Sequence, residues 1–243
     1  MNTALKSHFL RLWQKRGLEG LALLRAVLAP DTGLKVAVSS SFGAESAVLL
    51  DLVAQVDAAT PVLTVDTGKL FDETVAYRER LVDHFGLSDV RVLQPSDTLV
   101  ASADPDGLLH QDDPDACCQV RKVMPHAAAA ADFDVLITGR KRFHGGARGA
   151  LAPVHKEGLH LKVNPLASWG EIDIETAFVD RALPRHPLVA ADYRSIGCAV
   201  CTFKTGDGDG VRAGRWAGKD KTECGLHMTA HEPRHLNTQE TGQ

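Results

Sequence analysis

The 243-residue sequence contains no apolar segment that approaches the roughly 20 residues needed to cross a bilayer. Its first apolar stretch, residues 21–28, is interrupted by Arg25, and the basic residues before it are scattered, unlike those of a secretory signal peptide. The sequence also lacks an excess of positive charge, since its formal net charge is -4. General attraction to nucleic acid or to an anionic membrane is therefore not expected. We expect a cytoplasmic protein with no membrane and no nucleic-acid partner.

The cysteines are too few and too unevenly placed for a disulfide framework. There are five, an odd number, and in the cytoplasm cysteines that matter usually bind metal or react. Cys117 and Cys118 are adjacent, Cys198 and Cys201 form a C-x-x-C, and Cys224 stands alone, which predicts four ligands and one spare thiol. Adjacent cysteines reach two corners of a cubane more easily than they share one small ion. This favours a [4Fe–4S] cluster; a single zinc ion is the main alternative, followed by unrelated buried cysteines.

Apolar runs alternate with helical patterns over the first 138 residues. Branched apolar residues predict buried strands at 34–38, 61–65, 90–93 and 134–138. Apolar residues at helical spacing predict one or two helices within 3–28 and further helices at 44–56, 71–85 and 114–131. This alternation predicts an α/β fold with a doubly wound, mostly parallel sheet. Ligands of such sheets bind beyond the carboxyl ends of the strands, so we expect the site in the loops after Val38, Val65 and Thr138.

The pattern weakens after residue 138. Residues 139–150 are rich in Gly and Arg, 171–183 predict one more helix, and 205–243 are polar, Gly-rich and weakly periodic. We therefore expect two units. Residues 1–204 would form the nucleotide-binding α/β domain with the cluster, and residues 205–243 a flexible C-terminal segment that carries Cys224 and is mobile unless docked on the site.

The loop after the first strand, residues 39–46, combines small hydroxyl residues with Gly43. A tight turn of this kind lets backbone N–H groups converge on an anion, and the N-terminus of the following helix favours phosphate. The loop lacks the G-x-x-x-x-G-K-[ST] pattern of a Walker A motif. An ordinary strand-to-helix turn with serine caps explains the same residues equally well.

Several segments together resemble the adenylyl-sulfate and phosphoadenylyl-sulfate reductase family. Residues 39–46 look like its modified PP-loop, 65–74 match its V-D-T-G-x-x-F-x-E-T segment, and 223–227 match its E-C-G-L-H. The C-C…C-x-x-C spacing is that of its cluster-bearing branch, which implies a [4Fe–4S] cofactor. The resemblance implies the adenine-nucleotide alpha-hydrolase (PP-loop) type of fold, and a nucleotide whose phosphate is held without ATP being cleaved.

The resemblance further implies reduction of adenosine 5′-phosphosulfate to sulfite and AMP in assimilatory sulfate reduction. Cys224 would carry an S-sulfonate, and thioredoxin or glutaredoxin would be the electron donor. The main alternative is reduction of the 3′-phosphorylated substrate. A PP-loop tRNA-thiolating enzyme is disfavoured by the altered loop and by the negative net charge. A redox sensor that lacks turnover is disfavoured by the intact E-C-G-L-H segment. Assembly into a homo-oligomer stays open.

The same resemblance suggests which residues form the site. The catalytic set comprises Cys224, His227 and Lys122, which lies four residues after Cys118, and the cluster ligands are Cys117, Cys118, Cys198 and Cys201. The expected substrate-binding residues are Ser39, Ser41, Gly43, Asp66, Thr67, Gly139, Arg140, Arg142, Arg212 and Arg215. A role as helix caps explains Asp66 and Thr67 as well. For the arginines, the usual outcome of such a run of basic residues is a solvated basic face. Where many members have T-G-x-R-R followed by a polar pair, residues 138–146 differ, so the role of each arginine stays open.

Overall fold

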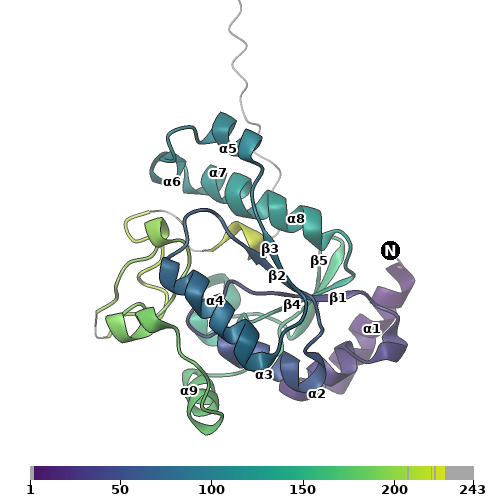
Figure 1. Ribbon diagram of the computed structural model, residues 1–243. Coiled ribbons are helices and arrows are strands. Elements are labelled where there is room, and N and C mark those ends of the chain that lie inside the picture. Colours follow the sequence, from purple (N-terminus) through teal and green to yellow (C-terminus); the bar gives the residue numbers. More distant parts are fainter. Residues whose placement is uncertain (1–2, 207, 220, 222, 228–243) are drawn as a thin grey trace, which may run out of the picture.

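A computed structural model describes residues 3–206, 208–219, 221 and 223–227, apart from the side chains of Ala147 and His227. The described chain contains a sheet of six strands in the order β3-β2-β1-β4-β6-β5 (Figure 1). Neighbouring strands run parallel except β5 and β6, which are antiparallel. The predicted mostly parallel, doubly wound sheet is confirmed. The strands are β1 (Val36–Ser39), β2 (Val62–Val65), β3 (Val90–Leu93), β4 (Val135–Thr138), β5 (Val154–Glu157) and β6 (His160–Val163).

The central strands are apolar because both faces of the sheet are covered. All four residues of β2 and all four of β4 are buried, and Val38 of β1 lies opposite Val62 on one side and Ile137 on the other. Strands buried on both faces need continuous apolar runs, which is the pattern that made them visible in the sequence. The edge strand β3 is only partly buried.

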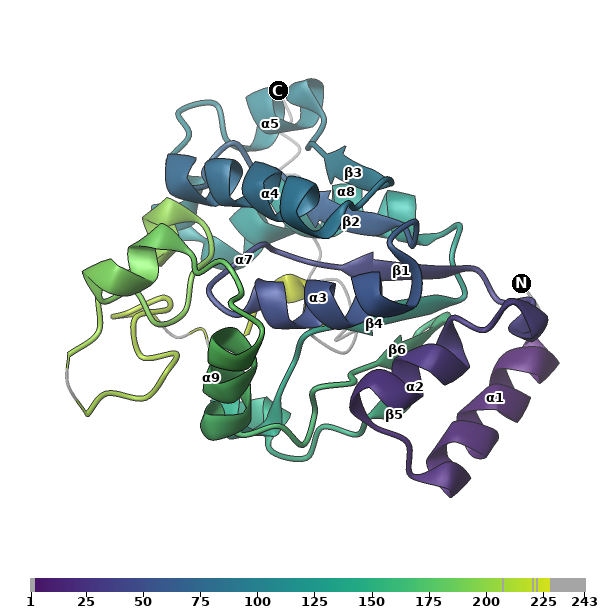
Figure 2. The same cartoon turned by 60° about the horizontal axis from the view of Figure 1, so that its bottom comes forward.

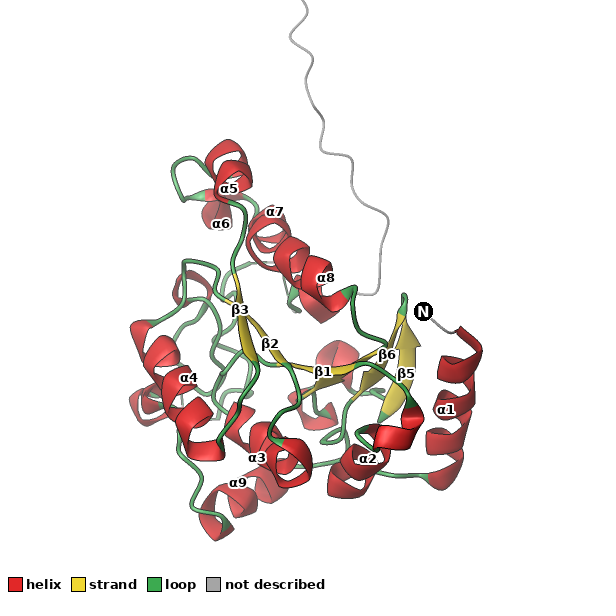
Figure 3. Ribbon diagram, turned by 45° about the vertical axis from the view of Figure 1, so that its right-hand side comes forward, coloured by secondary structure: helices red, strands yellow, loops and turns green. Residues whose placement is uncertain are grey.

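Helices cover the two faces unequally (Figure 3). One face carries α1 (Thr3–Arg16), α2 (Gly20–Val27), α3 (Ser46–Asp57), α4 (Asp72–Phe85) and α9 (Glu171–Asp180). The other carries α5 (Asp97–Ala103), α6 (Leu109–Asp112), α7 (Pro114–Cys118) and α8 (Met124–Ala130), with α8 packed on β2 and β3. The helices predicted within 3–28, 44–56, 71–85 and 171–183 are confirmed. The predicted helix 114–131 is interrupted by a π-helical turn, Gln119–Val123.

The β5–β6 hairpin was not predicted. Its strands mix charged and apolar residues, so they carry little of the signal of a buried strand. The charge is accommodated inside the fold: Lys162 on β6 is buried and pairs with Glu157 on β5 at 3.3 Å. The partner across the hairpin accommodates the charge of Lys162, while Leu161 and Val163 of the same strand pack in the core.

The part of the C-terminal segment that the structure describes is docked beside the carboxyl ends of the strands (Figure 2). Thr202 and Arg215 form an antiparallel bridge, and Trp216 is buried. A Cβ on Gly214 would lie 2.1 Å from the Phe203 carbonyl oxygen, so only glycine fits this turn. The division into units at residue 204 stays a prediction, and residues 228–243 lie outside the described residues. No helix in the described chain combines the length and apolar character of a membrane span.

Candidate active site

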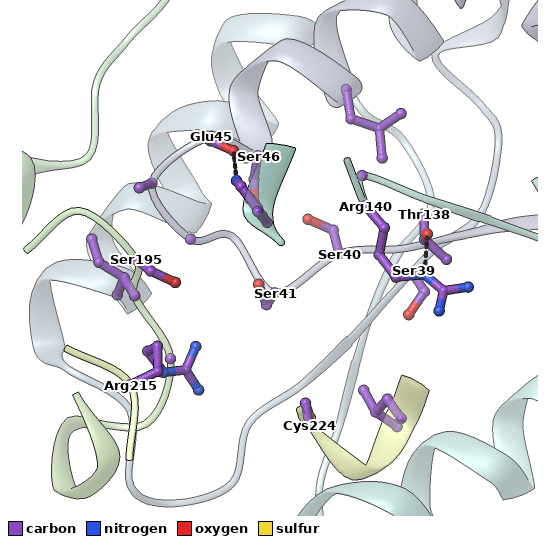
Figure 4. Close-up of a pocket in the computed structure, with 18 of the residues that line it drawn as sticks. Ser39, Ser40, Ser41, Glu45, Ser46, Thr138, Arg140, Ser195, Arg215 and Cys224 are labelled. Carbon is purple, nitrogen blue, oxygen red and sulfur yellow. Dashed lines mark hydrogen bonds and ion pairs between the residues drawn. The ribbon is translucent and has the colours of Figure 1, made fainter. Parts of the chain in front are cut away.

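A pocket lies beyond the carboxyl ends of β1, β2 and β4, as the sequence predicted (Figure 4). Ser39, Val65 and Thr138, each the last residue of its strand, line it. The strand order reverses between β1 and β4, and open α/β sheets bind ligands at such a point. The predicted residues that line the pocket are Ser39, Ser41, Gly43, Gly139, Arg140, Arg212, Arg215, Lys122 and Cys224.

The serine loop between β1 and α3 is tightly bent. Phe42 is buried and has a φ of 48°, a left-handed conformation that is strained for a bulky side chain. The Ser40 hydroxyl accepts a hydrogen bond from the Phe42 N–H at 3.2 Å. A Cβ on Gly43 would lie 2.9 Å from the Ile196 carbonyl oxygen, so glycine lets residues 195–197 approach the loop. Backbone strain at a pocket wall is typical of functional sites.

A buried histidine orients the first serine of this loop. His126 Nε2 lies 2.8 Å from the Ser39 hydroxyl oxygen. Burial, followed by the charges of Lys162 and His160, lowers the pKa of His126 to about 4, so its ring is neutral near pH 7. His126 was not predicted as a site residue. Its position on α8, one helical turn after Lys122, was the available signal.

Two of the predicted arginines present buried polar groups to the pocket. Arg140 is 7% exposed; its Nε donates to the Thr138 hydroxyl at 3.3 Å and its Nη2 forms an ion pair with Glu157 Oε2 at 3.5 Å. Arg215 Nε has no hydrogen-bond partner among the described residues, although the guanidinium lies 4.3 Å from the Trp216 ring centroid. Buried donors are normally satisfied, and arginine suits phosphate and sulfate oxygens. Arg215 in particular therefore points to an anionic ligand.

Another part of the pocket wall contains a compact ionic cluster that was not predicted. Glu45 Oε2 lies 2.6 Å from Lys141 Nζ and 3.0 Å from His144 Nε2 (Figure 4 marks a Glu45 contact). Burial favours the neutral acid, but Lys141 and His144 outweigh it and hold the pKa of Glu45 at about 2. The Glu45 carboxylate is therefore charged throughout the physiological range.

We expect Glu45→Gln to destabilise the protein by roughly 1–3 kcal/mol near pH 7, because Lys141 loses its buried partner. The folded-state pKa lies below the ordinary value of 4.5, so this stabilisation is complete above pH 4.5 and declines as the pH falls toward 2. Urea unfolding of both proteins over this pH range measures the difference. A difference in unfolding free energy that does not shrink on acidification would contradict this assignment.

The four predicted ligand cysteines come from two segments. Cys117 and Cys118 end α7, and Cys198 and Cys201 belong to the loop after residue 195; each of the five cysteines is a free thiol. Electrostatic interactions link Cys117 with Cys118 and with Cys198, and Cys201 with Cys198, so the two segments converge. Among the described residues no three His, Cys, Asp or Glu side chains are grouped to hold a single metal ion.

Thr67 and Lys122 both contact this cysteine group. The Thr67 hydroxyl lies 3.2 Å from Cys198 Sγ, and Lys122 forms a hydrogen bond with Cys198. Burial disfavours the charged lysine, but the neighbouring Cys198, Cys224 and Cys118 outweigh it and raise the pKa of Lys122. Since Lys122 also lines the pocket, its ammonium group lies between the cysteines and the space for a ligand.

Three of the predicted substrate-binding residues are engaged outside the pocket. Asp66 accepts a hydrogen bond from the Gly68 N–H at 3.0 Å, which is a turn-stabilising contact. Thr67 belongs to the cysteine group, and Arg142 Nε donates to the Leu151 carbonyl at 2.8 Å. His227 ends a short 3-10 turn, and its side chain lies outside the described residues.

Cys224 lies at the pocket wall together with Arg215 and the serine loop (Figure 4). It interacts electrostatically with the positive charges of Lys122, Lys221 and Arg212. A Cβ on Gly225 would lie 2.8 Å from Val123 Cγ2, so this glycine lets the segment pack on the π-helical turn. The arrangement places one nucleophile among cations that suit an oxyanion.

Other residues of the pocket and its surroundings were missed. Glu45 and Glu223 lie inside motifs recognised in the sequence, and Arg148 lies in the Gly- and Arg-rich stretch 139–150. No sequence pattern showed which partners these residues have. Residues 195–197 directly precede the C-x-x-C and line the pocket. His144 and Arg194 line the pocket as well. Their partners belong to distant segments, so only the fold identifies them.

Comparison with known proteins gives consistent matches over most of the chain. The family model described as phosphoadenosine phosphosulfate reductase domain matches residues 35–204. The chain is 47% identical over 198 residues to adenosine 5′-phosphosulfate reductase of Mesorhizobium japonicum, covering 82% of this chain and 78% of that protein. It is 36% identical over 229 residues to phosphoadenosine 5′-phosphosulfate reductase of Gloeobacter violaceus, covering 90% and 92%.

A solved structure shows the same fold. Phosphoadenylyl-sulfate (PAPS) reductase from Candida auris, a phosphate complex, superposes with a TM-score of 0.65 at 20% identity. The match covers 82% of this chain and 96% of that one. At this identity the likeness establishes the architecture alone.

Proposed function

The chain belongs to the phosphoadenosine phosphosulfate reductase family, and we propose that it reduces adenosine 5′-phosphosulfate to sulfite and AMP in assimilatory sulfate reduction. It is an oxidoreductase acting on a sulfur group. The names of its relatives in Mesorhizobium japonicum and Chelativorans support this substrate. One observation carries the proposal: Cys224 lines the same pocket as Arg140, Arg212 and Arg215 and the bent serine loop at the end of β1.

The pocket would hold the substrate by its negative charges. The serine loop and the N-terminal end of α3 suit a phosphate group, because tight turns and helix N-termini present backbone N–H groups to anions. Arg140, Arg212 and Arg215 would neutralise phosphate and sulfate oxygens, and Lys122 would face the sulfate from the cysteine side. These contacts bring the sulfur atom to Cys224, which supplies the proximity that a displacement requires.

Cys224 would act by covalent catalysis. Its thiolate attacks the sulfate sulfur, the bond from sulfur to the bridging oxygen breaks, and AMP leaves with that oxygen. The protein then carries a Cys224 S-sulfonate. A thiolate of a thioredoxin- or glutaredoxin-type dithiol attacks Cys224 Sγ and displaces sulfite, and the second donor thiol resolves the mixed disulfide. The dithiol supplies both electrons and ends as a disulfide, and Cys224 is regenerated.

The four other cysteines, Cys117, Cys118, Cys198 and Cys201, would hold a [4Fe–4S] cluster. Four free thiols that converge from two segments form a suitable donor set, and Thr67 and Lys122 supply hydrogen bonds to one of them. When bound, the cluster would tune the electrostatic field at the substrate. Lys122 would transmit this effect, because it contacts Cys198 and lines the pocket. Electron transfer through the cluster would not be required, because the donor dithiol supplies both electrons.

A comparison of the two adenylyl sulfates tests the reaction and its substrate. We expect kcat/KM for adenosine 5′-phosphosulfate to exceed that for its 3′-phosphorylated form by roughly 100-fold, since a phosphate without a matching site is rejected. Sulfite release with thioredoxin is measured for both compounds. The 36%-identical relative in Gloeobacter violaceus makes the second substrate the rival. The reverse preference would establish that rival, and no release from either compound would refute the proposed reaction.

A further inference from the structure

The carboxylate of Glu223, the residue before Cys224, is held by two arginines. Its two oxygens lie 2.6 Å from Arg148 Nε and 2.9 Å from Arg148 Nη2, and Arg212 Nη2 lies 3.7 Å away. The three side chains are only 13%, 10% and 15% exposed, respectively. A two-bond arginine–carboxylate pair that is largely buried is stronger and more specific than an exposed ion pair.

This pair connects the Cys224 segment to the wall formed after β4. Arg148 Nη1 lies 3.2 Å from His144 Nδ1, and His144 Nε2 lies 3.0 Å from Glu45, the residue before α3. Glu223 is therefore joined through three side chains to the loop that follows β1. Glu223 itself is not among the described residues that line the pocket, so it does not face the ligand.

A second attachment lies a few residues before Glu223. Lys221 is buried and forms an ion pair with Asp115 on α7, and Lys219 Nζ donates to the His110 carbonyl at 3.0 Å. The segment is thus fixed both to α7, which carries two cysteines, and, through Arg148, to the wall formed after β4. Because Cys224 directly follows Glu223, the Glu223–Arg148 pair sets the distance between the thiol and the pocket.

We propose that Glu223 is a positioning residue that places Cys224 for attack through its ion pair with Arg148; this inference rests on the proposed covalent role of Cys224. The pair is needed while the S-sulfonate forms, because displacement at sulfur requires a fixed approach of the thiolate. Cys224 is half-buried, so loss of the pair should also make its thiol easier to reach from outside.

The test compares Glu223→Gln and Glu223→Asp with wild type. Glu175→Gln is the matched control, since Glu175 also forms a two-bond pair with an arginine, Arg185, but on the exposed side of α9. The measurements are the AMP dissociation constant, the single-turnover release of AMP without an electron donor, and the alkylation rate of Cys224 by iodoacetamide, followed by mass spectrometry of its peptide.

We expect Glu223→Gln to slow the AMP burst about tenfold or more at saturating substrate and to accelerate alkylation similarly, as expected for loss of a charge-assisted pair. The AMP dissociation constant should change less than about threefold, Glu223→Asp should be intermediate, and Glu175→Gln should match wild type. An unchanged burst and alkylation rate in Glu223→Gln would overturn the inference, as would weaker AMP binding with a normal burst at saturation. If wild type gives no AMP burst, the proposed reaction fails, whereas the alkylation rates still decide whether Glu223 holds the segment.

Discussion

Replacement of Cys224 by serine is expected to reduce sulfite release by at least about 10³-fold, because a serine hydroxyl cannot form the sulfur–sulfur bond of the intermediate. The substitution changes one half-buried atom, so folding and AMP binding should be retained. Sulfite release from adenosine 5′-phosphosulfate with thioredoxin measures turnover, and the mass of the protein after incubation with substrate alone reports the S-sulfonate.

Two results would contradict this role of Cys224. One is sulfite release by Cys224→Ser at the wild-type rate. The other is a sulfonate adduct that forms on a different cysteine of the wild-type chain. The AMP dissociation constant of the variant serves as the control, because a large loss of binding would indicate a damaged pocket rather than a missing nucleophile.

Replacement of Cys198 by serine is expected to lower the iron and acid-labile sulfide per chain at least about tenfold, with an equal or larger loss of sulfite release. Cys198 is the informative ligand because Thr67 and Lys122 both contact it, so its loss also releases the lysine that lines the pocket. Elemental analysis of anaerobically purified protein measures iron, sulfide and zinc together.

Cys224→Ser is the matched control for this measurement. It is expected to keep its iron and lose turnover, whereas Cys198→Ser loses both. Should Cys198→Ser fail to fold, as judged by circular dichroism, Cys201→Ser provides the same test from the other end of the C-x-x-C. Full iron in both ligand variants, or zinc in place of iron in the wild type, would refute the cluster assignment.

The sequence by itself predicts a division of labour among the cysteines. Adjacent cysteines and a C-x-x-C are local patterns, and the chemistry of thiol ligands constrains such patterns directly. The central strands were equally visible, because a strand covered on both faces must be apolar along its length. These features also placed the pocket, since the carboxyl ends of parallel strands meet at one edge of the sheet.

The tertiary structure decided which polar and charged residues belong together. Glu45 pairs with His144, Arg148 with Glu223, and Ser39 with His126, each across 75 to 99 residues of sequence. The same holds for β5 and β6, where Glu157 pairs with Lys162 across the hairpin and with Arg140 from the loop after β4. A local pattern reports what a residue needs, such as an apolar neighbour or a turn. It does not report which distant residue supplies the partner, because electrostatic and hydrogen-bond pairing depends on positions that only the folded chain fixes.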